Sequence, residues 1–213
     1  MANTKTSYPA SLSVEYPKSP DRVTSFLRPI WSIPILILVS ILSSTESTDY
    51  VNEAGRHVTS NSGGIMAGLF AATALMIAFR QKYPRWWFDF ALELTRFSAR
   101  VGAYLFLLTD KYPSTTDKQS VSLDVSYPDA EKDLDRLLPL VKWILAIPHY
   151  IVLAFLMIGV GFATIIAWFS ILFTGEYPKS LFDYVVGVGR WCLRVNAYAF
   201  LLVTDEYPPF SLD

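Results

Sequence analysis

The sequence predicts an all-α membrane protein built from two tandem repeats, each a transmembrane helical hairpin followed by an interfacial amphipathic helix. Three observations lead to this prediction. The 213 residues are 52% hydrophobic and 17% charged, with a mean hydropathy of +0.32. Soluble domains average about 45–50% apolar and about 25% charged residues. In addition, long runs are nearly uncharged, and the two halves of the chain resemble each other.

The charge balance and the motif content exclude several classes of protein. A nucleic-acid-binding protein carries a basic surplus, whereas here 18 Lys and Arg oppose 19 Asp and Glu, so no nucleic-acid partner is expected. The sequence has no Gly-rich phosphate loop, no nucleophile elbow and no His-Glu-x-x-His motif. We therefore expect no enzyme activity, no catalytic residues, no cofactor and no metal site.

The first half contains two uncharged runs that predict the first hairpin. The expected spans are 27–42 and 64–80, joined by a polar outer loop at 43–63. Each run is at the short end of the roughly 17–25 residues that cross a bilayer. Pro34 lies inside the first run, where a proline removes a backbone donor and kinks a helix.

The second half has a longer apolar run, which ends at Phe173 and carries no charge in its last 31 residues, those after Lys142. One straight helix of that length would reach about 46 Å, whereas a hydrocarbon core measures about 30 Å. The sequence Gly159-Val160-Gly161 lies near the middle, where glycines permit a tight reversal. We therefore predict a second hairpin with spans 139–157 and 161–174.

An internal repeat relates the two halves. Residues 79–108 aligned with 173–202 share 13 identities in 30 positions. The alignment divides the chain into an N-terminal tail (1–10), repeat 1 (11–113), a linker (114–122) and repeat 2 (123–213). Alternating apolar residues at 11–16 and 121–127 predict short strands. These strands either pair in a small cytoplasmic sheet or are extended linkers.

The segments 86–108 and 180–202 are predicted to be amphipathic helices, with charged residues along one face. They either lie flat at the membrane interface or span the bilayer with buried charges. Flat placement puts 17 of the 18 Lys and Arg on one side and leaves Arg56 in the outer loop. The positive-inside rule then makes that side, with both termini, cytoplasmic.

Two sets of side chains are candidates for function. Charged residues on the amphipathic faces either bind lipid headgroups, since Arg matches phosphate geometry, or form an internal ion-pair network: Asp89, Arg96, Arg100, Asp183, Arg190 and Arg194. Aromatic residues suited to the lipid–water boundary are expected as interfacial anchors: Trp86, Trp87, Trp143, Trp191, Tyr104 and Tyr198. His149 is either a ligand for haem or chlorophyll or a histidine at a helix end.

Several strings in the second repeat resemble a known family. They are Phe-Thr-Gly-Glu-Tyr-Pro at 173–178, Leu-Phe-Asp at 181–183, Arg-Trp-x-x-Arg-Val-x-Ala-Tyr at 190–198 and Thr-Asp-Glu-Tyr-Pro-Pro-Phe at 204–210. They are similar to the bacterial membrane family called domain of unknown function 4389, here in two tandem copies of which the second is closer. The resemblance implies a bacterial membrane location and no particular activity.

Together these inferences predict an accessory or structural subunit of the bacterial inner membrane. It would be a multi-pass protein that contacts membrane lipids and packs against other membrane protein subunits of a larger complex. Two alternatives stay open. One is a small transporter or channel built from the two repeats, because transporters often contain internal repeats. The other is a lipid-binding membrane protein.

Overall fold

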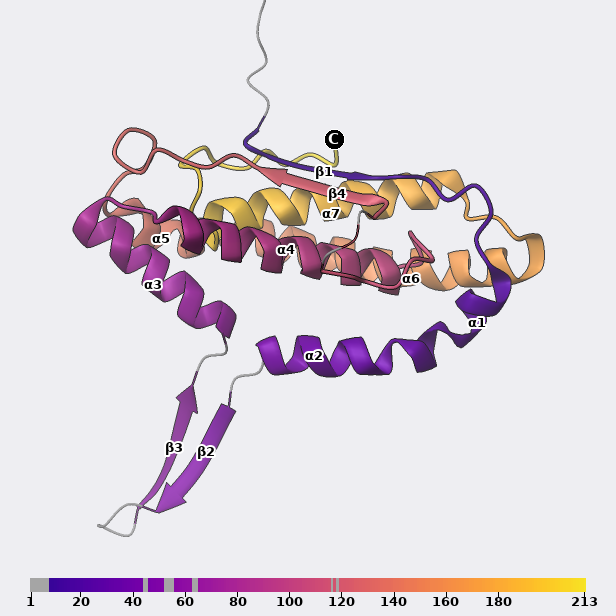
Figure 1. The fold of residues 1–213 in the computed structure, drawn as a ribbon, viewed down its shortest axis with the longest axis horizontal. Helices are drawn as coiled ribbons and strands as arrows, with labels where there is room; N and C mark the ends of the chain where they lie inside the picture. Colours follow the sequence, from indigo (N-terminus) through magenta and orange to yellow (C-terminus); the bar gives the residue numbers. More distant parts are fainter. Residues whose placement is uncertain (1–7, 44–45, 52–55, 63–64, 116, 118) are drawn as a thin grey trace, which may run out of the picture.

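The computed structural model describes residues 8–43, 46–51, 56–62, 65–115, 117 and 119–213. Most of the described chain is helical, with two short antiparallel sheets (Figure 1). The elements in chain order are β1 (Ala10–Val14), α1 (Arg22–Trp31), α2 (Ile33–Ser43), β2 (Glu46–Val51), β3 (His57–Ser62), α3 (Ile65–Arg80), α4 (Arg85–Leu105), β4 (Val121–Val125), α5 (Leu138–Leu145), α6 (Ile147–Thr174) and α7 (Lys179–Ala199).

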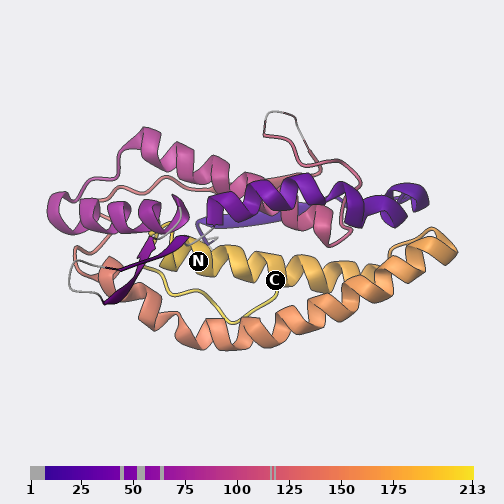
Figure 2. The same ribbon diagram turned by 90° about the horizontal axis from the view of Figure 1, so that it is seen from below.

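The elements form layers along the long axis of the molecule. The β1–β4 sheet covers one side of α4 and α7, with β1 packed on α7 and β4 on α4. On the other side, α6 packs on α7, while α1 contacts α6 and α3 contacts α5. Seen from below, α6 curves along α7 (Figure 2). The β1–β4 sheet and α6 therefore lie on different sides of α7.

The β1–β4 pair confirms the small sheet expected from the alternating residues. The register places Leu12 opposite Leu123 at the centre of the pair. Along β4, Val121, Leu123 and Val125 are buried, and the two residues between them are exposed. The alternation is that of a strand with one face on the core. Leu12 and Leu123 also occupy equivalent positions in the sequence repeat, which relates Tyr16 to Tyr127 by the same spacing.

The predicted second hairpin is wrong, because α6 continues without a break through Gly159 and Gly161. Gly159 serves a close helix contact instead of a reversal. A Cβ atom at this position would lie 2.4 Å from the Tyr184 hydroxyl, which donates a hydrogen bond to the Leu156 carbonyl at 2.9 Å. The length of the run was compatible with one long helix as well as with a reversal, and α6 is one continuous helix that curves alongside α7 (Figure 2).

The two glycines are expected to respond differently to alanine. Gly161 faces open space, so Gly161→Ala should raise the free energy of unfolding by up to about 1 kcal/mol through helix propensity. Gly159→Ala displaces the Tyr184 hydroxyl and should be at least about 1 kcal/mol less stable than Gly161→Ala. Chemical unfolding in detergent checks this difference, and Tyr184→Phe should reduce it. A loss of stability at both positions would support a reversal at these glycines.

The first half departs from the predicted spans in two places. The predicted span 27–42 is a bent pair, α1 and α2, which meet at 42° next to Ser32. The predicted loop 43–63 contains β2 and β3, which pair antiparallel and extend away from the helices. By contrast, α3 matches the predicted span 64–80 to within one residue, and α4 and α7 match the predicted amphipathic helices to within three residues at each end.

Prolines explain where the helices break. Pro34 and Pro148 are each the second residue of a helix, α2 and α6. Proline is tolerated in the first helical turn, where its missing N–H would have no intrahelical partner. The predicted kinks therefore occur just before the prolines, at Ser32 and Ala146.

Among the described residues, one stretch is long and apolar enough to cross a membrane. It is Leu138–Thr174, with 37 residues, which joins α5 to α6. The bent α1–α2 pair passes the same test if it is taken as one segment, and α3 is apolar but shorter. Four separate spans, as expected from the sequence, are thus not established.

Candidate functional site

Two buried ion pairs tie the apolar helices to the loops that follow α4 and α7. Arg28 in α1 contacts Asp110 at 2.5 Å, and Lys142 in α5 contacts Asp205 at 2.7 Å. The two cationic side chains are 4% and 0% exposed, respectively. Such pairs stay ionised inside a protein only when further hydrogen bonds replace the lost water.

Backbone carbonyls and tyrosine rings supply these further contacts. Arg28 donates to the carbonyls of Tyr104 and Thr109 at 2.7 and 3.1 Å. Lys142 donates to the Thr204 carbonyl at 2.7 Å. Each cation also lies over a tyrosine ring, Arg28 over Tyr104 at 4.6 Å and Lys142 over Tyr198 at 5.2 Å. The two sites are therefore built alike.

Sequence reasoning missed these ion pairs as sites, although a signal for them was present. Arg28 and Lys142 stand at the same distance before an Ile-Pro pair, and Asp110 and Asp205 recur in the Asp-x-Tyr-Pro strings. The spacing within each helix cannot show that a cation meets an aspartate 82 or 63 residues later in the chain.

Arg96 and Arg190 each bind the strand of the opposite half. Arg96 in α4 donates from Nε to the Leu123 carbonyl at 2.9 Å, and Arg190 in α7 donates from Nε to the Leu12 carbonyl at 3.1 Å. Arg96 also pairs with Asp124 of β4 at 2.9 Å and, within its own helix, with Glu93 at 2.6 Å. Arg96 therefore attaches β4 to α4, and Arg190 attaches β1 to α7.

Arg100 and Arg194 hold the segments that follow their helices. Arg100 donates to the Ser114 carbonyl at 2.5 Å. Arg194 donates to the carbonyls of Ser211 and Asp213, the latter at 2.6 Å. Burial lowers the pKa of the Arg194 guanidinium, while Asp213 favours its charged form. Arg100 and Arg194 therefore hold in place the backbone of the segments that follow α4 and α7.

Asp89 and Asp183 lie on the exposed ends of the same helices. Asp89 pairs with Arg85 at 3.1 Å, and Asp183 pairs with Lys179 at 2.8 Å, each one helical turn apart. All six charged candidates therefore have partners within the chain. The contacts are those of an internal network, and the four arginines direct their hydrogen bonds to backbone or to neighbouring carboxylates.

The repeated Tyr-Pro pairs form a matching set of contacts between the halves. The Tyr16 hydroxyl donates to the Tyr177 carbonyl, and the Tyr127 hydroxyl donates to the Tyr83 carbonyl. Tyr83 and Tyr177 are 3% and 1% exposed. Burial raises the pKa of Tyr177 to about 12, so its phenol stays protonated at physiological pH. These hydrogen bonds therefore have a structural role, because each of them joins one half of the chain to the other.

The structure corrects three of the six expected interfacial anchors. Tyr104, Tyr198 and Trp191 are 1%, 2% and 5% exposed, because α7 and the end of α4 pack under the sheet and against α6. Two other anchors are exposed, Trp86 in α4 and Trp143 in α5. Trp87 is half-buried and donates to the Thr73 hydroxyl at 2.8 Å. Helical periodicity alone cannot tell a lipid-facing aromatic from a core aromatic.

His149 is enclosed by aromatic residues in the third position of α6. Its Nδ1 accepts a hydrogen bond from Trp191 Nε1 at 3.0 Å, and its ring stacks on Phe210 at 4.0 Å. The side chain is fully buried, and its Nε2 has no hydrogen-bond partner among the described residues. In the part of the chain that the structure describes, no group of three or more His, Cys, Asp or Glu side chains could hold a metal ion.

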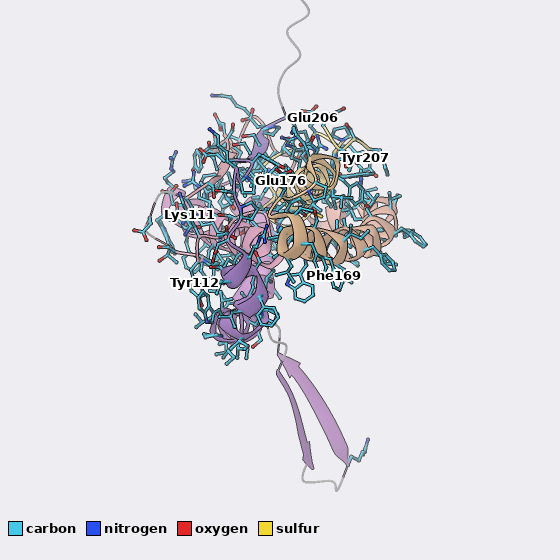
Figure 3. The ribbon with its side chains drawn as sticks, turned by 90° about the vertical axis from the view of Figure 1, so that its right-hand side faces the viewer. Lys111, Tyr112, Phe169, Glu176, Glu206 and Tyr207 are labelled. Carbon is cyan, nitrogen blue, oxygen red and sulfur yellow. The ribbon has the colours of Figure 1, made fainter. Side chains whose placement is uncertain are left out.

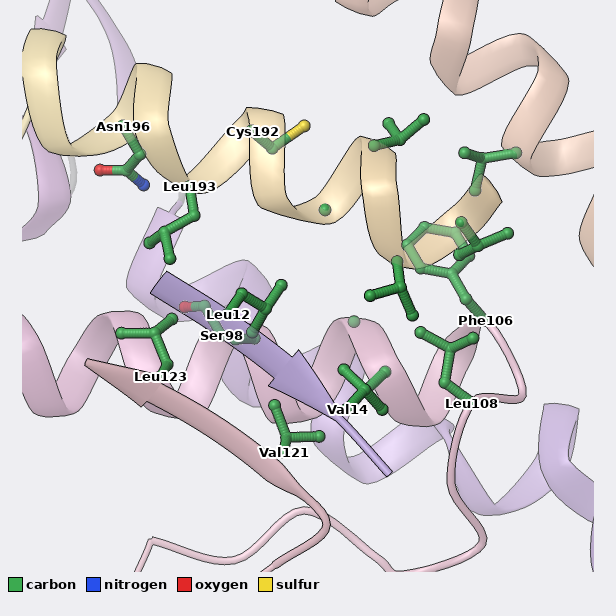
Figure 4. Close-up of a pocket in the computed structure, with 18 of the residues that line it drawn as sticks. Leu12, Val14, Ser98, Phe106, Leu108, Val121, Leu123, Cys192, Leu193 and Asn196 are labelled. Atoms are coloured by element: carbon green, nitrogen blue, oxygen red, sulfur yellow. The ribbon is translucent and has the colours of Figure 1, made fainter. Parts of the chain in front are cut away.

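A cavity of about 240 Å³ lies under the sheet, between α4 and α7 (Figure 4). Leu12 and Leu123 line it from the strands, and Ser98, Cys192 and Asn196 are among the few polar residues that line it from the helices. Burial raises the pKa of the Cys192 thiol, so this cysteine is a poor nucleophile at neutral pH. The lining carries no charged side chain, and the cavity has no groups for acid–base chemistry.

Comparison with known proteins gives one family match. The family model described as Domain of unknown function (DUF4389) matches residues 138–211, which include α5, α6, α7 and most of the C-terminal tail. The match supports the resemblance to this family in the second half of the chain, and it finds one copy rather than the two tandem copies that we expected. No curated protein and no solved structure matches the chain. Residues 138–211 are thus similar to the DUF4389 family.

Proposed function

We propose that the protein is a structural subunit embedded in the bacterial inner membrane, where its apolar layer packs against lipid and against other membrane proteins. The observation that carries this proposal is the exposure of the longest helix. In the most apolar window of Leu138–Thr174, with a mean hydropathy of 2.5, only 22% of the residues are buried within the chain. An apolar surface of this extent requires lipid or a protein partner.

Two faces of different polarity support an embedded position. Phe155 and Phe162 of α6 and Phe26 of α1 are 71%, 64% and 60% exposed. An end-on view labels Glu206 near the sheet and Phe169 on the opposite side (Figure 3). We therefore place the apolar helices in the bilayer and the sheet, with both termini, toward the cytoplasm, where the basic residues belong.

This arrangement favours helices that lie along the membrane over several separate crossings. The helices α4, α6 and α7 run side by side along the long axis (Figure 1). If α6 crossed the bilayer upright, the charged middle of α4 with Glu93 and Arg96 would enter the hydrocarbon core, which is costly. A flat orientation keeps these charges near the headgroups, in agreement with the interfacial alternative.

A duplication explains why the contacts occur in matched pairs. Arg96 and Arg190 bind the strand of the opposite half, and Arg28 and Lys142 form the two buried ion pairs. The proposal is that two copies of one unit exchange strands around a pseudo-twofold axis through the Leu12–Leu123 pair. The single family match at 138–211 fits a first copy that has diverged and acquired the β2–β3 insert.

The internal bonding of the charged residues favours a structural role over the alternatives. The six charged candidates are engaged within the chain, and the cavity under the sheet is lined without charge. A transporter needs a polar path, and the apolar helices of one chain supply few polar groups for it.

Membrane fractionation tests the embedded position. The protein expressed in a bacterium should stay in the membrane pellet after washing at high salt and high pH and should require detergent for release. The variant Phe155→Lys/Phe162→Lys should pass into the soluble fraction or lose yield, because it places charges on the apolar face. The control Ser11→Lys/Ser122→Lys changes exposed positions of the β1–β4 sheet and should stay in the pellet. Recovery of the unmodified protein in the supernatant would contradict the proposal.

Gentle purification tests the role as a subunit. Protein extracted in a mild detergent should carry a second membrane protein in a constant ratio, identified by mass spectrometry. Purification as a homogeneous self-assembly without any partner would instead favour the transporter alternative.

A further inference from the structure

A groove of about 520 Å³ separates the bent α1–α2 pair from the second half of α6. Leu36 lines it on one side, and Ile165, Trp168 and Phe169 line it on the other. Ile165 and Phe169 are 56% and 49% exposed. The groove therefore opens on the same apolar surface that we place in the bilayer.

The groove also contacts polar groups that lack partners. Ser25 and Arg28 line it and are 0% and 3% exposed. The Ser25 hydroxyl and Arg28 Nε are buried and have no hydrogen-bond partner among the described residues. A buried donor without an acceptor is unfavourable, and an acceptor oxygen that enters the groove beside Ser25 and Arg28 would relieve this cost.

The equivalent place in the other half is filled by the protein itself. Counted from the Ile-Pro pairs at 33–34 and 147–148, Leu36 corresponds to Tyr150. Thr164 also lines the groove, and the offset that aligns 79–108 with 173–202, extended toward the N-terminus, relates it to Phe70. Both of these larger rings pack against Phe200, at 5.8 Å from Phe70 and 6.3 Å from Tyr150. The groove thus exists where smaller side chains replace two aromatic rings.

The charge at the groove indicates what kind of oxygen it would accept. Arg28 already pairs with Asp110 at 2.5 Å, so its positive charge is balanced and a second anion is not required. The two orphan groups can each donate one hydrogen bond, which suits a neutral carbonyl oxygen. The remaining walls are apolar and suit a hydrocarbon chain.

We propose that the groove holds one acyl chain of a membrane glycerolipid, whose ester carbonyl accepts hydrogen bonds from Ser25 and Arg28. The acyl chain lies along Leu36, Ile165 and Phe169 and takes the volume that Phe70 and Tyr150 occupy in the other half. This inference rests on the proposed membrane position, since the groove must face lipid to be filled.

Tryptophan quenching measures this binding directly. Trp168 lines the groove, so a phosphatidylcholine with brominated acyl chains should quench its fluorescence in detergent micelles. Other tryptophans are quenched as well, so the signal from the groove is the difference in quenching between the parent protein and the Trp168→Phe variant. The titration needs no membrane fractionation, so its failure alone leaves the membrane position of the protein standing. Failure of the fractionation test would instead remove the membrane position and the groove proposal together.

Filling the groove should abolish the binding. The variant Leu36→Tyr/Thr164→Phe introduces the two aromatic rings that Tyr150 and Phe70 supply in the other half. It should weaken lipid binding about tenfold or more. The matched control Leu38→Tyr/Ile166→Phe adds similar bulk at exposed positions outside the groove and should bind as the parent does. Equal quenching in the filled variant and the parent would overturn the proposal.

A smaller change tests the carbonyl contact if the filled variant fails to fold. Ser25→Ala should weaken binding of the ester-linked lipid about fivefold, the worth of one hydrogen bond. It should have no effect on the ether-linked lipid, which lacks the carbonyl. An equal loss with both lipids, or tighter binding of a brominated free fatty acid than of the ester lipid, would overturn the assignment.

Discussion

Replacement of Lys142 by methionine is expected to lower the free energy of unfolding by about 3–5 kcal/mol. Methionine keeps the length of the side chain but removes the charge that faces Asp205 at 2.7 Å. The Thr204 carbonyl loses its hydrogen bond as well. The aspartate is then left in a largely buried place without a counter-ion, which costs more than the pair itself contributes. Unfolding by denaturant in detergent, followed by circular dichroism, measures the change.

Two variants make this expectation specific to burial. Lys142→Met/Asp205→Asn should recover part of the loss, because the uncompensated charge disappears. Lys132→Met removes the cation of an exposed pair with Asp129, in which the lysine is 80% exposed, and should change stability by less than about 1 kcal/mol. A similar small effect at Lys142 and Lys132 would mean that the ion pair between α5 and the loop after α7 is open to solvent.

Trp191→Ala is expected to lower the free energy of unfolding by about 3–5 kcal/mol, as large core truncations do. The indole is 5% exposed and donates to His149 Nδ1 at 3.0 Å. Its removal leaves a cavity beside Phe210, which contacts the indole at 5.5 Å, and leaves His149 without its donor. Denaturant titration measures this effect on the purified protein.

Two controls separate the packing of Trp191 from a role at a membrane boundary. Trp191→Phe keeps most of the volume and should cost about 1–2 kcal/mol through the lost hydrogen bond. Trp86→Ala truncates a tryptophan that is 68% exposed and should leave the stability in detergent within about 0.5 kcal/mol. If Trp191→Ala proved as mild as Trp86→Ala, the burial of Trp191 between the sheet and α6 would be wrong.

The contrast between α4 and α7 shows the limit of reasoning from periodicity. The spacing of their charged residues predicted that both are amphipathic helices at the membrane interface, and both do form helices. The structure buries most of α7, because β1 covers its arginine side and α6 covers the opposite side. Arg190 and Arg194 meet carbonyls that belong to Leu12 and to the C-terminal tail. The residue pattern within one helix does not indicate which strands from distant parts of the chain will pack on that helix.

The local properties of this protein can be determined from its sequence. Apolar runs, alternation and prolines located most helix ends and both strands of the β1–β4 sheet, because these features act over a few neighbouring residues. The repeat also identified which residues would be equivalent. Only the tertiary structure decided that β1 packs on α7 and β4 on α4, that α6 stays continuous through its glycines, and that Arg28 and Lys142 contact aspartates in distant loops. These outcomes depend on the free energy of packing between segments that are far apart in the chain. A local sequence pattern does not determine this free energy.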